Sequence, residues 1–206
     1  MKKRGRPPKS AQEENQSRKI IDATIRLLSH KGASAVTIRN VCQEADISNG
    51  TFYHHFQNKD DLLMYFVRDT LFGDFDLMTP YCDIAGRIIE LYLHLLQKYQ
   101  SLGKDFMKHF YNTENHALSA YMNAPGGAFA PGTIMERSEL EISKAQELGY
   151  IRTDCNVHEL CADICTVVKG CIFEWCLEDG RMDAHASMRR IIAACIRPHL
   201  ADSNPH

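Results

Sequence analysis

Residues 36–63, VTIRNVCQEADISNGTFYHHFQNKDDLL, constrain the fold of this chain more than any other stretch. Thr37 belongs to the residue types that cap helix N-termini, and Ile38 and Val41 follow it at helical spacing. The helix is expected to end near Asp46, because Asp tolerates the left-handed conformation of a sharp turn better than most residues. The stretch therefore predicts a first short helix that ends in a tight turn.

A second short helix is expected after the turn. Ser48 can cap its N-terminus, and residues 49–51 are small or polar, which lets this helix end come close to another surface. Phe52 and Phe56 stand four residues apart and supply the buried face. The Tyr-His-His run at residues 53–55 is left to point outward or sideways. These are hydrogen-bonding groups that suit phosphates and base edges.

The same stretch resembles the DNA-binding segment of the tetracycline-repressor (TetR) family. The resemblance rests on the Thr-x-Arg opening, the Ile-Ser-x-Gly-Thr-x-Tyr-x-His-Phe core and the Lys-x-x-Leu that follows, all without a gap. It extends back to Ile20, and outside about residues 15–66 it is one of architecture and length only. Two positions depart from the family pattern, since Ala is common where Cys42 stands and Gly where Asp46 makes the turn. Neither departure threatens the fold.

The resemblance implies an all-α fold in three parts: a basic disordered arm (residues 1–13), a three-helix helix-turn-helix domain (14–61) and a helical effector-binding and dimerisation domain (62–206). Asn58 is expected to cap the helix that links the last two parts. Tyr53, His55 and Lys59 are interpreted mainly as phosphate contacts, and Asn49, Gly50, Thr51 and His54 as nearer to base edges. The full set expected at DNA in this domain is Thr37, Arg39, Ser48, Asn49, Gly50, Thr51, Tyr53, His54, His55 and Lys59.

The basic arm contains a short sequence motif. Arg4, Gly5 and Arg6, followed by Pro7, resemble an AT-hook, in which an extended Arg-Gly-Arg lies along a narrow minor groove. The alternative is a solvated basic tail that adds non-specific phosphate attraction. Basic residues outnumber acidic ones in residues 1–61 and the reverse holds in the rest of the chain, although the net charge is only −2. This asymmetry fits an N-terminal module that meets phosphates.

Apolar periodicity predicts helices throughout the chain and no strand. One helix is expected before the turn, over about residues 14–30. The helices expected in the body cover about residues 83–99, 104–111, 115–122, 133–148, 156–178 and 183–196. Residues 124–132, APGGAFAPG, interrupt the pattern and predict a loop that could act as a lid.

The last two helices carry apolar stripes. Gly170 lies inside the longer one, and a Gly there costs about 1 kcal/mol relative to Ala, so a close helix–helix approach would compensate. The resemblance implies that these helices pair with a second copy as a four-helix bundle. A core within one chain is the alternative. The residues expected at the dimer interface are Leu160, Ile164, Val168, Cys171, Ile172, Ile191, Ile192 and Cys195.

An effector site is also implied by the resemblance, in the part of the body that is rich in aromatic and thioether side chains. Ligand pockets are mostly apolar with a few placed polar groups, a description that His109 and His116 would meet beside their aromatic neighbours. The alternative, which each residue taken singly favours, is ordinary core. The candidate effector-binding residues are Phe106, His109, Phe110, Tyr111, His116 and Trp175.

Other functions are less well supported by the sequence. No phosphate loop, nucleophile elbow or His-Glu-x-x-His motif is present, so an enzyme is not expected, and no cofactor is predicted. His158, Cys161 and Cys165 share one helix face without a fourth ligand, so no metal is assigned. With neither a signal peptide nor an apolar run of membrane-spanning length, a cytoplasmic protein is expected. The prediction is a homodimeric, effector-released repressor; the alternatives are a DNA-organising protein without effector and a thiol- or metal-responsive regulator.

Overall fold

A computed structural model describes residues 9–64, 75–110 and 127–201, and within them the chain is helical. The N-terminal helices are α1 (Lys9–Lys31), η1 (Ala33–Ala35), α2 (Ile38–Ala45) and α3 (Asn49–His55), with a further helical segment at residues 59–64. The body contains η2 (Tyr81–Asp83), α5 (Ile84–Leu102), α6 (Lys104–Phe110), α8 (Ile134–Glu147), α9 (Val157–Leu177), α10 (Ala184–Ile196) and η3 (Arg197–His199). Among the described residues the only β pairing is one isolated bridge between Ile151 and Leu200. The all-α prediction is confirmed.

Polar side chains fix where most of these helices begin. Each accepts a hydrogen bond from a backbone N–H three residues further on, which satisfies one of the donors left open at a helix start. The capping residues are Thr37, Ser48, Asp83, Thr133, Asn156 and Asp183. The predicted starts of the body helices are confirmed to within one or two residues. The first helix differs: α1 already begins at Lys9, so residues 9–13 are helical rather than part of a disordered arm. The helix expected at about residues 115–122 lies outside the described residues.

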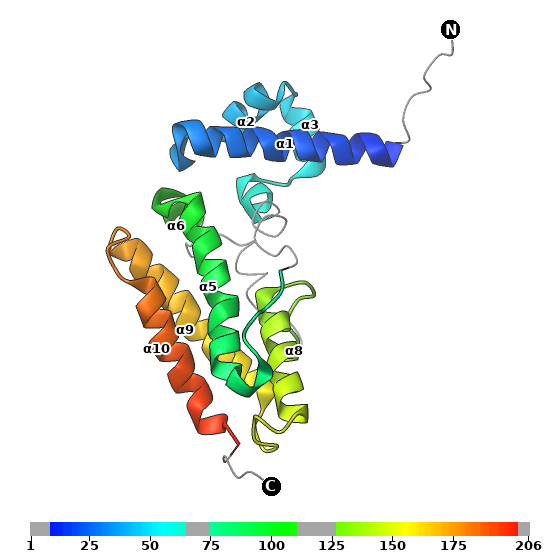
Figure 1. Cartoon of the computed structure of the whole chain (residues 1–206). Coiled ribbons are helices and arrows are strands. Elements are labelled where there is room, and N and C mark those ends of the chain that lie inside the picture. Colours follow the sequence, from blue (N-terminus) through cyan, green and yellow to red (C-terminus); the bar gives the residue numbers. More distant parts are fainter. Residues whose placement is uncertain (1–8, 65–74, 111–126, 202–206) are drawn as a thin grey trace.

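The molecule has two parts (Figure 1). Helices α1, α2 and α3 form the upper part, in which α1 packs against both short helices. In the body, α10 packs on α5 and α9, and α8 packs on the other side of α5 and on α9. The body core between these helices contains two fully buried tyrosines, Tyr92 and Tyr99, on α5. Helix α6 lies at the top of the body, where it contacts η1 of the upper part.

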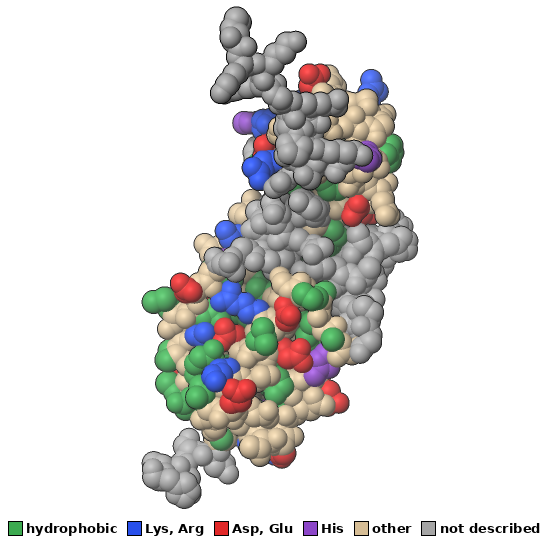
Figure 2. Space-filling view, turned by 90° about the vertical axis from the view of Figure 1, so that its right-hand side faces the viewer, with side chains coloured by type: hydrophobic (Ala, Val, Ile, Leu, Met, Phe, Trp, Pro, Cys, Tyr) green, Lys and Arg blue, Asp and Glu red, His purple; other side chains and the backbone are tan. Residues whose placement is uncertain are grey.

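The outer face of the body is mixed in charge. Figure 2 looks onto the side on which α8 lies and shows acidic and basic side chains interspersed there with hydrophobic ones. Leu140 of α8 is 63% exposed, and Met78, before α5, is 82% exposed. No helix of the described chain is long and apolar enough to cross a membrane.

Candidate nucleic-acid interface

Side-chain caps begin both α2 and α3, and one left-handed residue makes the turn between the two helices. Thr37 Oγ1 accepts a hydrogen bond from the Asn40 N–H (3.1 Å), and Ser48 Oγ accepts one from the Thr51 N–H (3.0 Å). Between them Asp46 adopts the left-handed conformation with φ 54° and ψ 52°, which confirms the expected turn. Its backbone N–H closes α2 by donating to carbonyl groups of that helix. The two helices are thereby held in a fixed relative orientation.

One face of α3 is buried and the other is open. Phe52 is fully buried and Phe56 is 3% exposed, as their spacing predicts. The opposite face presents the exposed residues Asn49, Gly50, Tyr53 and His54. A side chain added at Gly50 would meet only Ser48 Oγ at 3.6 Å, so the N-terminal end of α3 has open space around its backbone. This is the geometry that a helix needs to approach base edges.

Side chains of helix α1 bond to both α2 and α3. Arg26 Nε lies 2.8 Å from Glu44 Oε1 of α2, and the Arg26 hydrogen bond lowers the pKa of Glu44. At the other end of α1, the His55 ring is bonded twice: Nδ1 lies 3.0 Å from Ser17 Oγ, and Nε2 lies 3.2 Å from Gln16 Oε1. His55 was expected to contact a phosphate, but its half-buried ring is engaged with α1. Gln16 and Ser17 are functional neighbours that the sequence does not indicate.

The helical segment at residues 59–64 begins with a reciprocal cap. Asn58 Oδ1 accepts from the Asp61 N–H (2.8 Å), and Asp61 Oδ2 accepts from the Gln57 N–H (3.0 Å). The expected role of Asn58 is confirmed. Lys59 lies half-buried in the first turn, next to this helix N-terminus. Such a position suits an anion, because the N-terminal end carries partial positive charge.

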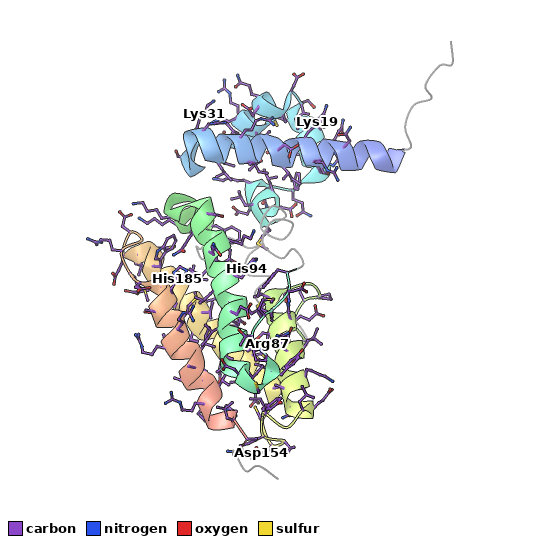
Figure 3. All side chains as sticks on the ribbon, in the orientation of Figure 1. Lys19, Lys31, Arg87, His94, Asp154 and His185 are labelled. Carbon is purple, nitrogen blue, oxygen red and sulfur yellow. The ribbon has the colours of Figure 1, made fainter. Side chains whose placement is uncertain are left out.

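The remaining candidates in this part are also surface residues. Thr37 and Arg39 at the start of α2 are exposed, whereas Thr51 is half-buried and its Oγ1 lies 2.9 Å from Ser48 Oγ. Figure 3 shows further basic side chains on α1, including the exposed Lys19 and Lys31. Arg4, Gly5 and Arg6 lie outside the described residues. Exposed cations therefore accompany α3 on the same part of the molecule.

Of the predicted effector residues, the structure describes two side chains. Phe110 at the end of α6 is fully buried, and Trp175 of α9 is 7% exposed. Phe106 and His109 lie on α6 with side chains outside the described part, and Tyr111 and His116 lie outside the described residues altogether. Whether these six surround one cavity stays a prediction.

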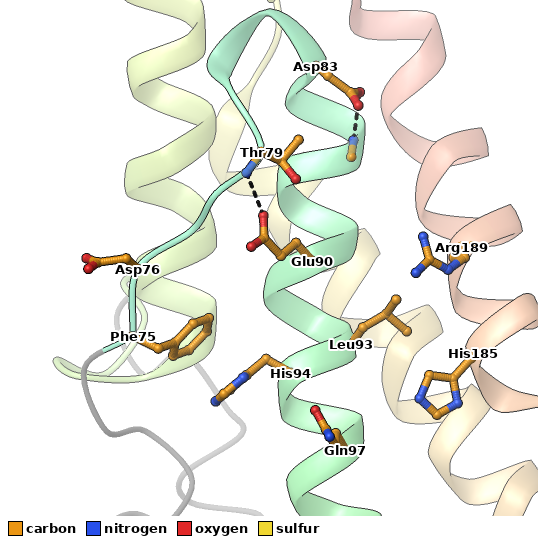
Figure 4. A pocket seen from close by; sticks show the side chains of 11 residues that line it. Phe75, Asp76, Thr79, Asp83, Glu90, Leu93, His94, Gln97, His185 and Arg189 are labelled. Carbon is orange, nitrogen blue, oxygen red and sulfur yellow. Dashed lines mark hydrogen bonds between the residues drawn. The ribbon is translucent and has the colours of Figure 1, made fainter.

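A groove of about 720 Å³ crosses the front of α5 between residues 75–79 and α10 (Figure 4). None of its lining residues was predicted. His94 stacks on the Phe75 ring with centroids 3.7 Å apart, and burial, with the nearby Lys98 and Arg137 charges, lowers the pKa of His94. The groove is lined by Phe75, Asp76, Thr79, Asp83, Gly86, Glu90, Leu93, His94, Gln97, His185 and Arg189.

The segment beside this groove, residues 75–80, is tied to α5. Glu90 accepts hydrogen bonds from the N–H groups of Met78 (2.9 Å) and Thr79 (2.8 Å). Burial would raise the pKa of Glu90, but these bonds and the Arg87 charge outweigh it and lower the pKa. Arg87 donates to the Thr79 carbonyl (2.6 Å) and pairs with Glu141 of α8 (2.7 Å). The chain entering α5 is thus fixed to two body helices.

The predicted dimer residues need correction. Helix α9 packs against α6, α8 and α10, and α10 packs against α5 and α9. Six of the predicted residues are therefore buried in the single chain: Leu160, Ile164, Val168, Cys171, Ile172 and Ile192. Ile191 and Cys195 are half-buried. The exposed stripe of α9 is a different one, made of Thr166, Gly170, Phe173 and Leu177 at intervals of three and four. A Cβ at Gly170 would meet nothing within 4 Å, so no helix of the described chain packs there.

The thiols lie mostly inside the fold. All eight cysteines are free, and burial raises the pKa of Cys161 to about 12. Within the described residues no group of three His, Cys, Asp or Glu side chains could hold a metal ion. His158, one of the residues weighed as a ligand, instead places Nδ1 2.9 Å from Glu139 Oε1.

Together these features define a helix-turn-helix protein with a helical body, and known proteins are similar to its N-terminal part. Residues 20–65 match the model of "Bacterial regulatory proteins, tetR family". The chain is 46% identical over 46 residues to an uncharacterized HTH-type transcriptional regulator, YerO, of Bacillus subtilis, covering 22% of this chain and 16% of that one. It is 39% identical over 64 residues to the regulator BetI of Burkholderia thailandensis, covering 31% of this chain and 33% of that one. The matched region thus spans a third or less of the length of these two relatives.

Solved structures extend the likeness in fold to about nine-tenths of the chain. A TetR transcription regulator from Haloarcula marismortui superposes with a TM-score of 0.61 at 22% identity, over 91% of this chain and 99% of that one. Thermus thermophilus FadR, a TetR-family repressor solved with lauroyl-CoA, gives 0.61 at 16% identity, over 92% and 98%. Residues 20–65 are thus similar to the DNA-binding domain of tetR-family regulators, and the chain shares its fold with solved TetR-family proteins.

Proposed function

We propose that this protein is a sequence-specific, DNA-binding repressor that a small-molecule effector releases from its operator. The observation that carries the proposal is the outward face of α3, where Asn49, Gly50, Tyr53 and His54 are exposed beside a capped turn. In helix-turn-helix proteins the second helix enters the major groove with its N-terminal residues at the base edges. The proposed function places the protein in the same compartment as its operator DNA, which we expect to be the cytoplasm.

The two kinds of contact are expected to come from different parts of this surface. Asn49 and Gly50 stand at the α3 N-terminus, nearest to base edges, whereas Lys59 stands at a separate helix N-terminus suited to a phosphate. Phosphate contacts position a protein on DNA, and base contacts specify the sequence. His55 serves in this proposal through its bonds to α1, which orient the end of α3.

A homodimer is proposed to present two copies of α3 to successive major grooves. The exposed α9 stripe of Thr166, Gly170, Phe173 and Leu177 supports this assembly, because Phe173 and Leu177 are 49% and 62% exposed. Gly170 would let a partner helix approach closely. Half-sites about 10 bp apart, or a little more, are expected for such a dimer.

The effector is proposed to bind in the body. Among proteins of this fold, FadR was solved with lauroyl-CoA and RolR with resorcinol, and both ligands are small organic molecules. Here the predicted site includes α6, and the groove between α5 and α10 is a second place to search. Release requires the effector to bind more tightly to the form of the dimer that does not fit the operator.

A footprint on DNA selected from fragments of the source genome tests the proposal against a DNA-organising protein. Two short, symmetrically placed protected regions are expected, and they should survive an excess of unrelated DNA. Broad protection of AT-rich DNA without a defined site would favour the organiser. Effector release is tested by screening small organic molecules for loss of that footprint.

A further inference from the structure

Helix α6 is the part of the body that contacts η1 of the DNA-binding part (Figure 1). It joins α5 through Gly103, whose φ of 86° and ψ of 149° form a conformation that is open essentially to glycine alone. On its inner side Met107 and Phe110 are fully buried. A helix of seven residues is not stable alone, so its position depends on the contacts around it.

One carboxylate ties a second face of α6 to the end of α9. Lys104 Nζ lies 2.9 Å from Asp179 Oδ2, and Lys108 Nζ lies 2.7 Å from Asp179 Oδ1. The two lysines are four residues apart and therefore share one face of α6. Asp179 stands just past the C-terminus of α9, with φ 58°. We call Lys104, Lys108 and Asp179 the clamp.

The position of Asp179 at the end of α9 favours pairing with cations. A carboxylate at a helix C-terminus is disfavoured by the helix dipole, so Asp179 needs cationic partners there. Hydrogen bonds from Lys108 and Lys104 lower the pKa of Asp179 to about 2. Asp179 is also held in a left-handed turn that Gly180 closes with a hydrogen bond to the Trp175 carbonyl (2.8 Å). The carboxylate is thus presented from a fixed backbone.

We propose that Asp179 is a positioning residue for DNA binding: through Lys104 and Lys108 it holds α6 against η1 and so fixes the DNA-binding part relative to α9 and α10. This inference rests on the proposed function, in which α9 forms the dimer interface and α3 reads DNA. Fixing the two DNA-binding parts before they meet DNA reduces the ordering cost of binding. In this proposal the fixed arrangement is the one that fits the operator, so loss of the clamp weakens operator binding.

Asp179→Asn tests this role, with Glu178→Gln as its matched control. Both variants remove one negative charge at the end of α9, and the Glu178 side chain is exposed. Exposed ion pairs are worth about 1 kcal/mol or less, so Asp179→Asn is expected to weaken operator affinity about two- to fivefold relative to the control. The difference should shrink between about 50 mM and about 300 mM salt, because salt screens exposed charges. In a Lys104→Gln, Lys108→Gln background, Asp179→Asn should add nothing.

Hydrogen exchange gives a readout that does not depend on DNA. Asp179→Asn, but not Glu178→Gln, should speed exchange of the Met107 amide, which bonds to the Gly103 carbonyl in α6, and of the Ala35 amide, which bonds to the Gly32 carbonyl at η1. Unchanged exchange at both amides, or operator affinity equal to that of the control, would overturn the proposal. If the parent protein binds no operator, the proposed function fails while exchange still tests the clamp.

Discussion

Ser17 Oγ of α1 lies 3.0 Å from His55 Nδ1 at the end of α3. This bond joins residues 38 positions apart and, with Gln16, couples the recognition helix to the helix that follows the basic arm. The His55 ring therefore joins the end of α3 to α1.

Ser17→Ala is expected to lower the free energy of unfolding by about 0.5–1.5 kcal/mol, because it removes a part-buried hydrogen bond and leaves His55 Nδ1 without this partner. Urea denaturation measures the change. Ser34→Ala, at an exposed serine of η1, is the control and should stay within about 0.5 kcal/mol of the parent. Equal stabilities for the two variants would show that the Ser17 bond contributes nothing.

Lys59→Ala is expected to weaken binding to every DNA sequence alike and to reduce the salt slope by about one unit, because we propose that Lys59 contacts a phosphate. Affinities at several salt concentrations, on the operator and on unrelated DNA, measure both effects. Lys144→Ala on α8, whose side chain pairs with Glu147, is the control with the same change of charge. If affinity and slope stay those of the parent, the phosphate assignment of Lys59 is wrong.

Phe173→Glu is expected to yield a folded monomer, since the side chain is 49% exposed on the α9 stripe and a charge there would be buried by a partner helix. Sedimentation measures the assembly, and circular dichroism checks the fold. Leu140→Glu, at a 63% exposed residue of α8, should leave a dimer. Charges at Ile164 and Ile172 should unfold the body instead, because both are fully buried in one chain. A Phe173→Glu dimer would remove this face from the interface.

The arm is expected to prefer A·T pairs beside the half-sites if Arg4, Gly5 and Arg6 lie in a minor groove. Replacing these pairs by G·C should then weaken binding by about 1–3 kcal/mol per disrupted contact. Deletion of residues 1–8 should erase the preference while leaving α1 intact. Gly5→Pro keeps the charge and restricts the backbone. If it behaves like the parent on AT- and GC-flanked operators, measured by competition at fixed salt, the arm is only a charged tail.

Local features of this fold could be predicted from the sequence because they depend on near neighbours. The caps at Thr37, Ser48 and Asn58 and the left-handed turn at Asp46 each involve residues within a few positions of one another. Helix starts in the body follow from the same chemistry. The sequence predicts the first helix from about residue 14, whereas α1 begins at Lys9. The basic, Pro-containing residues before Lys9 obscure where the helix begins.

Contacts between distant residues could not be predicted. Periodicity marks the buried stripe of α9, but it does not say whether that stripe faces its own chain or another. Ile164 and Ile172, which the sequence places at the dimer interface, are fully buried within one chain. The Ser17–His55 bond and the clamp at Asp179 join segments whose approach depends on the tertiary fold. The groove beside His94 arises in the same way, from α5, α10 and residues 75–79 together.

The most direct test of the account is selection of binding sites from random DNA by the parent and by Asn49→Ala, side by side. Asn49 is exposed at the α3 N-terminus, where the account places a base edge. The parent should enrich a two-fold symmetric motif, and Asn49→Ala should enrich a motif with changed preference at one position in each half-site. Identical motifs with equal affinities, or no motif for the parent, would contradict the claim that α3 reads the DNA sequence.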